Sequence, residues 1–311
     1  MRILFFLVFF LNINASFAET HKLKVVASFS VIGDMVNQIA GDKIDLFTIV
    51  GANMDAHIYE PKPQDLKSLK EADLLILNGF GFESWIEKII ESSGFKGKKI
   101  IASNGINPLF FNVKNTSQKI TDPHCWHSLP NGKHYVTNIM NALKEIDAQN
   151  ATFYEQNGKA YLQKLDDLDA ELKDTLKEIP ENKRVVITSH DAFEYLGKEY
   201  GVKFISPLGV STEAEPSSKE IADIVRRIKK DNIKAVFAEA TTDRRLVETI
   251  ACESGITIGG ELYSDALSGT KDCGDSYISM VRSNLLSLKA ALSEQNNKEK
   301  QKNSQKGCTI K

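Results

Sequence analysis

Short apolar runs alternate with segments of helical periodicity through the first part of the chain. Residues 24–28 are rich in β-branched side chains, and in residues 31–40 apolar positions recur every three or four residues before Gly41. A second strand is expected at residues 45–50. The continuous apolar run 74–77 is typical of a parallel strand that is covered on both faces. This alternation of strands and helices predicts a wound α/β unit.

The second half of the chain repeats the same order of elements. A strand is expected at residues 184–189, a helix follows over residues 193–200, and a second strand and helix lead to the apolar run 235–238. We therefore expect an α/β fold with two similar wound lobes, each a mostly parallel sheet flanked by helices. The first lobe is assigned to residues 19–146 and the second to residues 181–294.

A long amphipathic segment lies between the two lobes. Apolar residues recur at three- and four-residue steps over residues 151–178, and Pro180 ends the pattern. A helix of about 28 residues would span roughly 40 Å, so we assign residues 147–180 to one rigid helix that joins the lobes. A coiled-coil pairing of this stripe is the alternative. Residues 295–311 are rich in Lys, Gln and Asn, and we expect a disordered tail there.

Residues 1–18 have the pattern of a secretory signal peptide. Arg2 precedes an apolar run of about nine residues, and Ser16 and Ala18 frame a cleavage point before Glu19. A membrane anchor is the alternative, but a bilayer span needs roughly 20 apolar residues. Since no cysteine follows the apolar run, we expect a periplasmic protein that is exported by its signal peptide and is not lipid-anchored.

Composition and cysteine usage narrow the class of protein. With 42% apolar and 26% charged residues the chain is globular, and its net charge of −2 gives no reason to expect nucleic acid as a partner. In an oxidising compartment, Cys252 and Cys273, which lie 21 positions apart (273 − 252), are the expected disulfide. Such a bond would contribute on the order of 3 kcal/mol. Cys125 and Cys308 are isolated, which disfavours a thiolate metal cluster.

Three of the six histidines lie where parallel α/β sheets gather their ligand-binding loops. His57, His124 and His190 are 67 and 66 residues apart (124 − 57, 190 − 124), and Asp265 follows 75 residues later (265 − 190). Spacing alone does not distinguish metal ligands from hydrogen-bonded structural histidines. His127 could support such a site or lie on the surface.

Five motifs follow one another along the chain. They are Asp55-Ala56-His57-Ile58-Tyr59-Glu60-Pro61-Lys62-Pro63, Asp122-Pro123-His124-Cys125-Trp126, Thr188-Ser189-His190-Asp191-Ala192-Phe193, Phe237-Ala238-Glu239 and Tyr263-Ser264-Asp265. In sequence and order they resemble the solute-binding proteins of zinc and manganese ABC transporters, the ZnuA/TroA/PsaA type. The resemblance covers nearly all of the chain after residue 18. It implies two lobes joined by a rigid helix, with one divalent metal ion bound in the cleft and delivered to a membrane permease; we expect a monomer.

The same resemblance implies the metal ligands. His57 and His124 correspond to ligands from the first lobe, and His190 and Asp265 to ligands from the second. Manganese-type members usually carry Glu where His190 stands, whereas many zinc-type members have a His-rich loop that residues 111–121 lack. Imidazole suits Zn²⁺, and a carboxylate raises tolerance for Mn²⁺. We therefore expect one Zn²⁺ or Mn²⁺ ion as the transported ligand, with both metals able to bind.

Carboxylates near the ion are expected to support its ligands. Glu239 and Glu60 are the first choices, and Asp191 lies behind them. Because imidazole must be neutral to bind a metal and titrates near ~6.5, affinity should fall on acidification.

Two other functions could use the same residues. A metal-dependent hydrolase would need an open coordination position for water and a base such as Glu239. The sequence contains no HExxH or GxSxG motif. An adhesin built on the same scaffold would share the metal site. We expect a binding protein that is not an enzyme.

Overall fold

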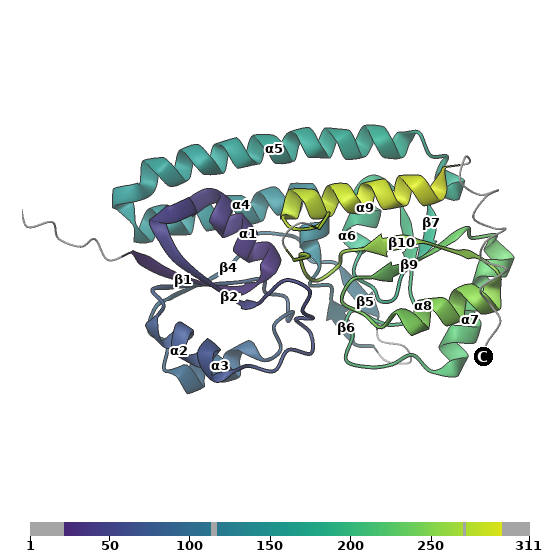
Figure 1. Ribbon diagram of the computed structural model, residues 1–311, viewed down its shortest axis with the longest axis horizontal. Coiled ribbons are helices and arrows are strands. Elements are labelled where there is room, and N and C mark those ends of the chain that lie inside the picture. The colour runs from purple at the N-terminus through teal and green to yellow at the C-terminus, as the bar shows by residue number, and fades with distance from the viewer. Residues whose placement is uncertain (1–21, 113–116, 270–271, 294–311) are drawn as a thin grey trace, which may run out of the picture.

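The computed structural model describes residues 22–112, 117–269 and 272–293. The expected signal peptide and tail, with Cys308, lie outside these residues. Figure 1 shows two α/β lobes side by side, with one long helix running past both of them. None of the helices in the described ranges is both long and apolar enough to cross a membrane.

The first lobe contains a four-stranded parallel sheet in the order β2-β1-β3-β4. Its strands are β1 (Leu23–Phe29), β2 (Ile44–Val50), β3 (Leu74–Leu77) and β4 (Lys98–Ile101). All four residues of β3 are buried, as expected for a central strand covered on both faces. The helices of this lobe are α1 (Ser30–Ala40), α2 (Pro63–Glu71), α3 (Ile86–Ser93) and α4 (Leu129–Ile146).

The second lobe repeats this topology. Its parallel sheet has the order β10-β9-β7-β8, with β7 (Val185–Ile187), β8 (Lys203–Ile205), β9 (Ala235–Glu239) and β10 (Thr257–Leu262). If β7 to β10 are matched in turn to β1 to β4, the two sheets have the same strand order. The helices are α6 (Glu194–Tyr200), α7 (Ser218–Asp231), α8 (Arg244–Ser254) and α9 (Tyr277–Leu292). The predicted α/β fold with two similar lobes is therefore confirmed.

A small antiparallel hairpin was not predicted from the sequence. It consists of β5 (Phe110–Asn112) and β6 (Lys119–Thr121), and it precedes the segment that carries His124. Each strand has only three residues, and alternation over so short a length is a weak signal.

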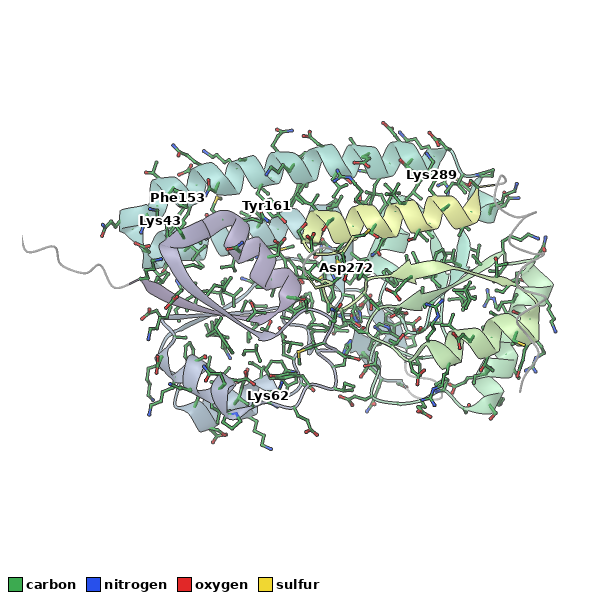
Figure 2. All side chains as sticks on the ribbon, in the orientation of Figure 1. Lys43, Lys62, Phe153, Tyr161, Asp272 and Lys289 are labelled. Atoms are coloured by element: carbon green, nitrogen blue, oxygen red, sulfur yellow. The ribbon has the colours of Figure 1, made fainter. Side chains whose placement is uncertain are left out.

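The connecting helix α5 (Ala151–Lys177) has 27 residues, slightly fewer than predicted, and packs against both lobes. At its first-lobe end, Lys43 Nζ lies 5.4 Å from the centroid of the Phe153 ring. Tyr161 donates a 3.4 Å hydrogen bond to Asp34 on α1, and beyond its second-lobe end Lys289 Nζ on α9 lies 2.8 Å from a Glu178 oxygen (Figure 2). The apolar residues of the stripe, among them Leu165, Leu168 and Leu172, are buried in the core of the same chain, which removes the reason for a coiled coil.

Gly158, the weak point of the predicted helix, has a packing role. A Cβ at this position would lie 2.5 Å from Met140 Sδ on α4. The absence of a side chain thus allows α4 and α5 to approach closely.

The expected disulfide is not present in the structure. Cys252 lies on α8 and Cys273 lies in the loop before α9; both are exposed, and they are not bonded to each other. The prediction used the loop length and the compartment. A disulfide also requires Cβ atoms within roughly 3.5–4.5 Å, which spacing along the chain cannot establish.

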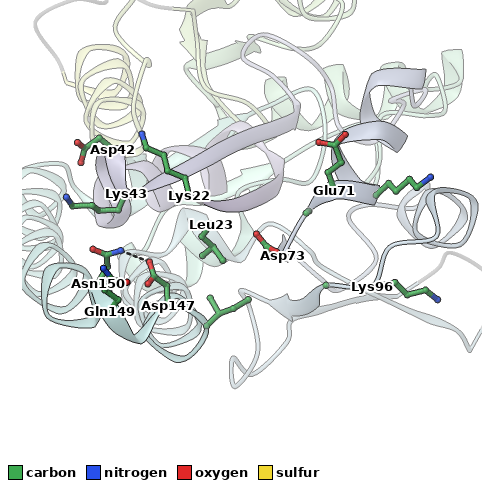
Figure 3. A pocket seen from close by; sticks show the side chains of 14 residues that line it. Lys22, Leu23, Asp42, Lys43, Glu71, Asp73, Lys96, Asp147, Gln149 and Asn150 are labelled. Carbon is green, nitrogen blue, oxygen red and sulfur yellow. Dashed lines mark hydrogen bonds between the residues drawn. The ribbon is translucent and has the colours of Figure 1, made fainter. Parts of the chain in front are cut away.

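A cavity of about 820 Å³ lies at the end of the first sheet where its strands begin (Figure 3). It is lined by four lysines and four acidic residues, so its charges balance: Lys22, Lys43, Lys70, Lys96, Asp42, Glu71, Asp73 and Asp147. Parallel sheets place their ligands at the opposite, carboxyl ends of the strands. A functional site is therefore expected at those ends.

Candidate metal centre

Four side chains that could bind a metal meet between the lobes. His57 lies in the loop after β2, and His124 directly precedes a 3-10 turn at Cys125–His127. His190 follows β7, and Asp265 follows β10. One ligand atom from each lies within 4.8 Å of every other, and all four residues are buried. The structure thus brings together the four predicted ligands, two from each lobe.

The distances fit a single ion. Asp265 Oδ1 is 3.3 Å from His124 Nε2 and 4.0 Å from His57 Nε2, and Asp265 Oδ2 is 3.2 Å from His190 Nε2. Ligand atoms about 2.1 Å from a tetrahedral Zn²⁺ ion are about 3.4 Å apart. Among the described residues, Asp265 Oδ1 and His190 Nε2 are buried without a hydrogen-bond partner. An ion shared by the four residues would satisfy both atoms.

Asp122 holds the imidazole of His124. Its Oδ1 atom lies 2.8 Å from His124 Nδ1 and accepts the backbone N–H of the same histidine at 2.9 Å. Fixing Nδ1 in this way directs Nε2 toward the centre. Asp122 was not among the predicted supporting residues. The Asp-x-His spacing could have indicated this contact, because an Asp side chain readily accepts the backbone N–H two residues further on. The same spacing occurs at Asp55 and His57.

Glu239 has the corresponding role at His190. Its Oε2 atom lies 2.5 Å from His190 Nδ1, and its Oε1 atom accepts the backbone N–H groups of Ser189 and His190 at 2.7 and 3.0 Å. One carboxylate at the end of β9 therefore fixes both the ring and the backbone of this histidine. A supporting role for Glu239 requires such a contact, and the role itself stays a prediction.

The other two predicted supporting carboxylates lie in different surroundings. Glu60 is exposed, so the reason for placing it beside the ion is lost. Asp191 is half-buried, accepts a hydrogen bond from Ser206, and donates its N–H to Gly209. Burial raises the pKa of Asp191 to about 6. Asp191 thus holds the loop after β8, and sequence proximity to a histidine ligand did not predict contact with its ring.

The charges at the centre are strongly coupled. Burial lowers the pKa of His57 to about 3. Burial also disfavours the charged form of His190, but the carboxylates of Glu239 and Asp265 raise its pKa well above the usual 6.5. The pKa of His124 is raised by Asp122 and Asp265 against the effect of burial. Conversely, the imidazoles of His190 and His124 hold the pKa of Asp265 well below its usual range despite burial.

His127 contacts the backbone of the residue that precedes Asp265. It is buried, burial lowers its pKa to about 3, and its Nε2 atom lies 3.0 Å from the Ser264 carbonyl oxygen. Trp126 Nε1 donates to the same oxygen at 3.1 Å. Two first-lobe rings thus hold the backbone next to Asp265, and the surface alternative for His127 is wrong.

Cys125 is not placed to bind the ion. It is buried, its sulfur lies 3.0 Å from the Tyr135 hydroxyl, and burial raises the pKa of the thiol to about 12. A neutral thiol is a poor metal ligand, because the thiolate is the form that binds.

Curated relatives with high similarity are metal-transport proteins. The manganese ABC transporter substrate-binding lipoprotein PsaA of Streptococcus mitis is 37% identical over 274 residues, covering 86% of this chain and 88% of the relative. The iron ABC transporter substrate-binding lipoprotein MtsA of Streptococcus pyogenes serotype M1 is 38% identical over 283 residues, covering 89% and 91%.

The names of these relatives correct one expectation. Both are lipoproteins, which contradicts the prediction that this protein is not lipid-anchored. That prediction rested on the absence of a cysteine after the apolar run in residues 1–18. This segment lies outside the described residues, and its apolar pattern alone does not determine whether a lipid anchor is present.

Solved structures show the same fold. A manganese-bound periplasmic metal binding protein from Candidatus Liberibacter asiaticus has a TM-score of 0.79 at 29% identity, covering 88% of this chain and all of that chain. The periplasmic zinc binding protein TroA from Treponema pallidum has a TM-score of 0.82 at 27% identity, with the same coverage. The family model described as zinc-uptake complex component A, periplasmic, matches residues 25–291. The chain therefore belongs to this family of metal-uptake binding proteins.

Proposed function

We propose that the protein binds one divalent transition-metal ion between its lobes and delivers it to the membrane permease of an ABC transporter. The convergence of three imidazoles and one carboxylate from four separate loops carries this proposal. The relatives are substrate-binding proteins of such transporters, which supports the transport role. That the protein acts as a monomer and binds no nucleic acid stay predictions.

The closed ligand set favours binding over catalysis. A catalytic zinc site has three protein ligands and keeps a fourth position for water. Here a fourth side chain, Asp265, lies with its oxygens 3.2–4.0 Å from the three histidine Nε2 atoms. Glu239, the residue a hydrolase would use as a base, is occupied by His190 and two backbone N–H groups.

Metal analysis together with a hydrolysis screen tests the proposed function. We expect the metal-stripped protein to take up one Zn²⁺ or one Mn²⁺ ion per chain in equilibrium titrations, with no metal-dependent cleavage of ester or peptide substrates. If neither metal binds to the stripped protein, the proposed metal site is wrong. Metal-dependent turnover would establish the hydrolase instead.

The donor atoms favour binding of both metals, with Zn²⁺ held more tightly. Imidazole nitrogen suits zinc, the carboxylate admits manganese, and intrinsic affinity follows the Irving–Williams order. The relatives and structures above are named for manganese, iron and zinc. We therefore propose a site of broad affinity, in which the identity of the residue at position 190 sets much of the preference.

Replacing His190 by Glu should shift the preference toward Mn²⁺. A new carboxylate would face Glu239, so the paired change H190E/E239Q avoids repulsion between two acids and leaves an amide that can donate. We expect the ratio of Zn²⁺ to Mn²⁺ affinity to fall by roughly tenfold or more, since oxygen replaces nitrogen. Competitive titration of the two metals measures this ratio, and Glu239→Gln alone is the control. An unchanged ratio would contradict the role given to His190.

A further inference from the structure

A side-chain hydrogen bond between the lobes reaches the loop that carries His57. Asp55 Oδ1 accepts the backbone N–H of His57 at 2.8 Å, and Asp55 Oδ2 accepts the hydroxyl of Thr212 at 2.6 Å. Asp55 belongs to the first lobe, whereas Thr212 lies in the second lobe, in the loop between β8 and α7. A single carboxylate therefore connects the backbone of a metal ligand with the opposite lobe.

This contact lies at the side of the centre that is nearest to solvent. The His57 side chain is 6% exposed, whereas those of His124, His190 and Asp265 are 0% exposed. A cavity of about 520 Å³ is lined by residues flanking the ligands, including Asp55, Ile58 and Ser189, and also by Thr212. Asp55 and Ile58 flank His57 in sequence, so the cavity lies beside the loop that carries His57.

His57 is also the least supported of the three histidines. Asp122 holds Nδ1 of His124, and Glu239 lies against Nδ1 of His190. Within the described residues, no carboxylate contacts Nδ1 of His57, and Asp55 contacts only the backbone N–H of this residue. The position of this imidazole therefore depends on the loop that carries it, and Asp55 connects that loop to Thr212.

The backbone N–H of Asn53, in the same loop as His57, also donates to the Leu267 carbonyl of the second lobe at 2.9 Å. Two further hydrogen bonds between the lobes are buried more deeply. Trp126 donates to the Ser264 carbonyl, and Leu267 donates its N–H to Ser30. All four of these residues are buried, whereas Asp55 and Thr212 are half-buried. Water competes more readily for a half-buried hydrogen bond. The Asp55–Thr212 contact can therefore break while the inner contacts remain.

We propose that Asp55 and Thr212 control the release of the bound ion. While the hydroxyl of Thr212 donates to Asp55, the loop keeps His57 in the coordination sphere. When this hydrogen bond breaks, His57 departs first and the ion leaves through the adjoining cavity. Asp55 is thus a positioning residue, and Thr212 couples it to the second lobe. The inference rests on the metal-binding function proposed above.

Release kinetics of the full-length protein test the proposal. Thr212→Val keeps the shape of the side chain and removes its hydroxyl. We expect zinc release into excess chelator, followed by stopped flow, to become roughly three- to tenfold faster, which is the effect of one lost hydrogen bond. The association rate should change less than twofold, because the ligands themselves are intact. Thr212→Ser restores the hydroxyl and should restore slow release.

Thr241 provides a matched control. It lines the same cavity, and its hydroxyl is buried without a hydrogen-bond partner among the described residues. Thr241→Val should leave release unchanged. Thr212→Ala repeats the loss of the hydroxyl without a β-branched side chain, in case valine perturbs the loop. Equal release rates in wild type, Thr212→Val and Thr212→Ala would overturn the proposal. If one zinc still binds per chain in these samples, the metal-binding function would stand independently of that result.

Discussion

Replacing Asp265 by alanine should lower Zn²⁺ affinity at least about a hundredfold, because even residues that only support a ligand contribute 10- to 100-fold. Asp265 is the only carboxylate among the four ligands, and its two oxygens face all three histidines. Its loss would leave three neutral imidazoles around a doubly charged ion in a buried site. Competition titration with a chelator of known affinity measures the effect.

Two further variants test whether the effect depends on the charge of the Asp265 side chain and on its place in the metal centre. Asp265→Asn keeps the shape but loses the charge, so we expect an affinity between those of wild type and Asp265→Ala. Asp272→Ala makes the same truncation at an exposed position before α9 and should leave affinity unchanged. Wild-type affinity in Asp265→Ala would contradict the assignment of this residue as a ligand.

The sequence predicted the architecture well where periodicity was long and continuous. The apolar run of β3, the stripe of α5 and the repetition of strands and helices in the second half all correspond to elements in the structure. These patterns arise because buried faces must be apolar at the period of the element. The short strands β5 and β6 contain too few residues for such a pattern.

Motif and resemblance pointed to the four candidate ligands that meet between the lobes, but the residues around them were harder to predict. Glu239 lies where a strand end meets the loop of His190 and contacts its ring, as a supporting role would require. Asp122 was overlooked although it lies two residues before His124. Glu60 is three residues from His57 and yet exposed. Whether a carboxylate contacts a nearby histidine depends on the direction in which its side chain points. In irregular loops this direction does not follow a repeating pattern along the sequence.

Contacts between the lobes could not be derived from sequence patterns. His127 and Trp126 both reach the carbonyl of Ser264, more than 130 residues away along the chain. Such hydrogen bonds depend on how two separately formed units meet. For the same reason, no pattern in the chain indicated that Thr212 would reach Asp55.

Metal affinity should depend steeply on pH, and the dependence should begin above the range of a free histidine. Without a metal, Glu239 and Asp265 raise the pKa of His190 against the effect of burial, and the pKa of His124 is raised as well. Both imidazoles must lose their protons to bind the ion. His57, whose pKa is lowered to about 3, is neutral over this range and releases none.

The release of protons on binding determines whether affinity rises or falls with pH. Above the raised pKa values the histidines are already neutral and affinity is constant, whereas below them each released proton lowers affinity about tenfold per pH unit. We expect Zn²⁺ affinity to begin falling at a pH above the range in which a free histidine titrates, and to fall by as much as roughly a hundredfold per pH unit where both histidines are charged. Titration calorimetry in two buffers of different ionisation enthalpy counts the protons directly.

Glu239→Gln shows whether the carboxylate at His190 sets this range. Loss of its charge removes one of the causes that raise the pKa of His190, so the fall in affinity should begin at lower pH. At alkaline pH the same variant should bind Zn²⁺ roughly 10- to 100-fold more weakly, because the ligand has lost its supporting acid. The pH profiles of wild type and variant should therefore converge on acidification. Parallel profiles, or binding without proton release, would contradict the charge coupling between Glu239 and His190.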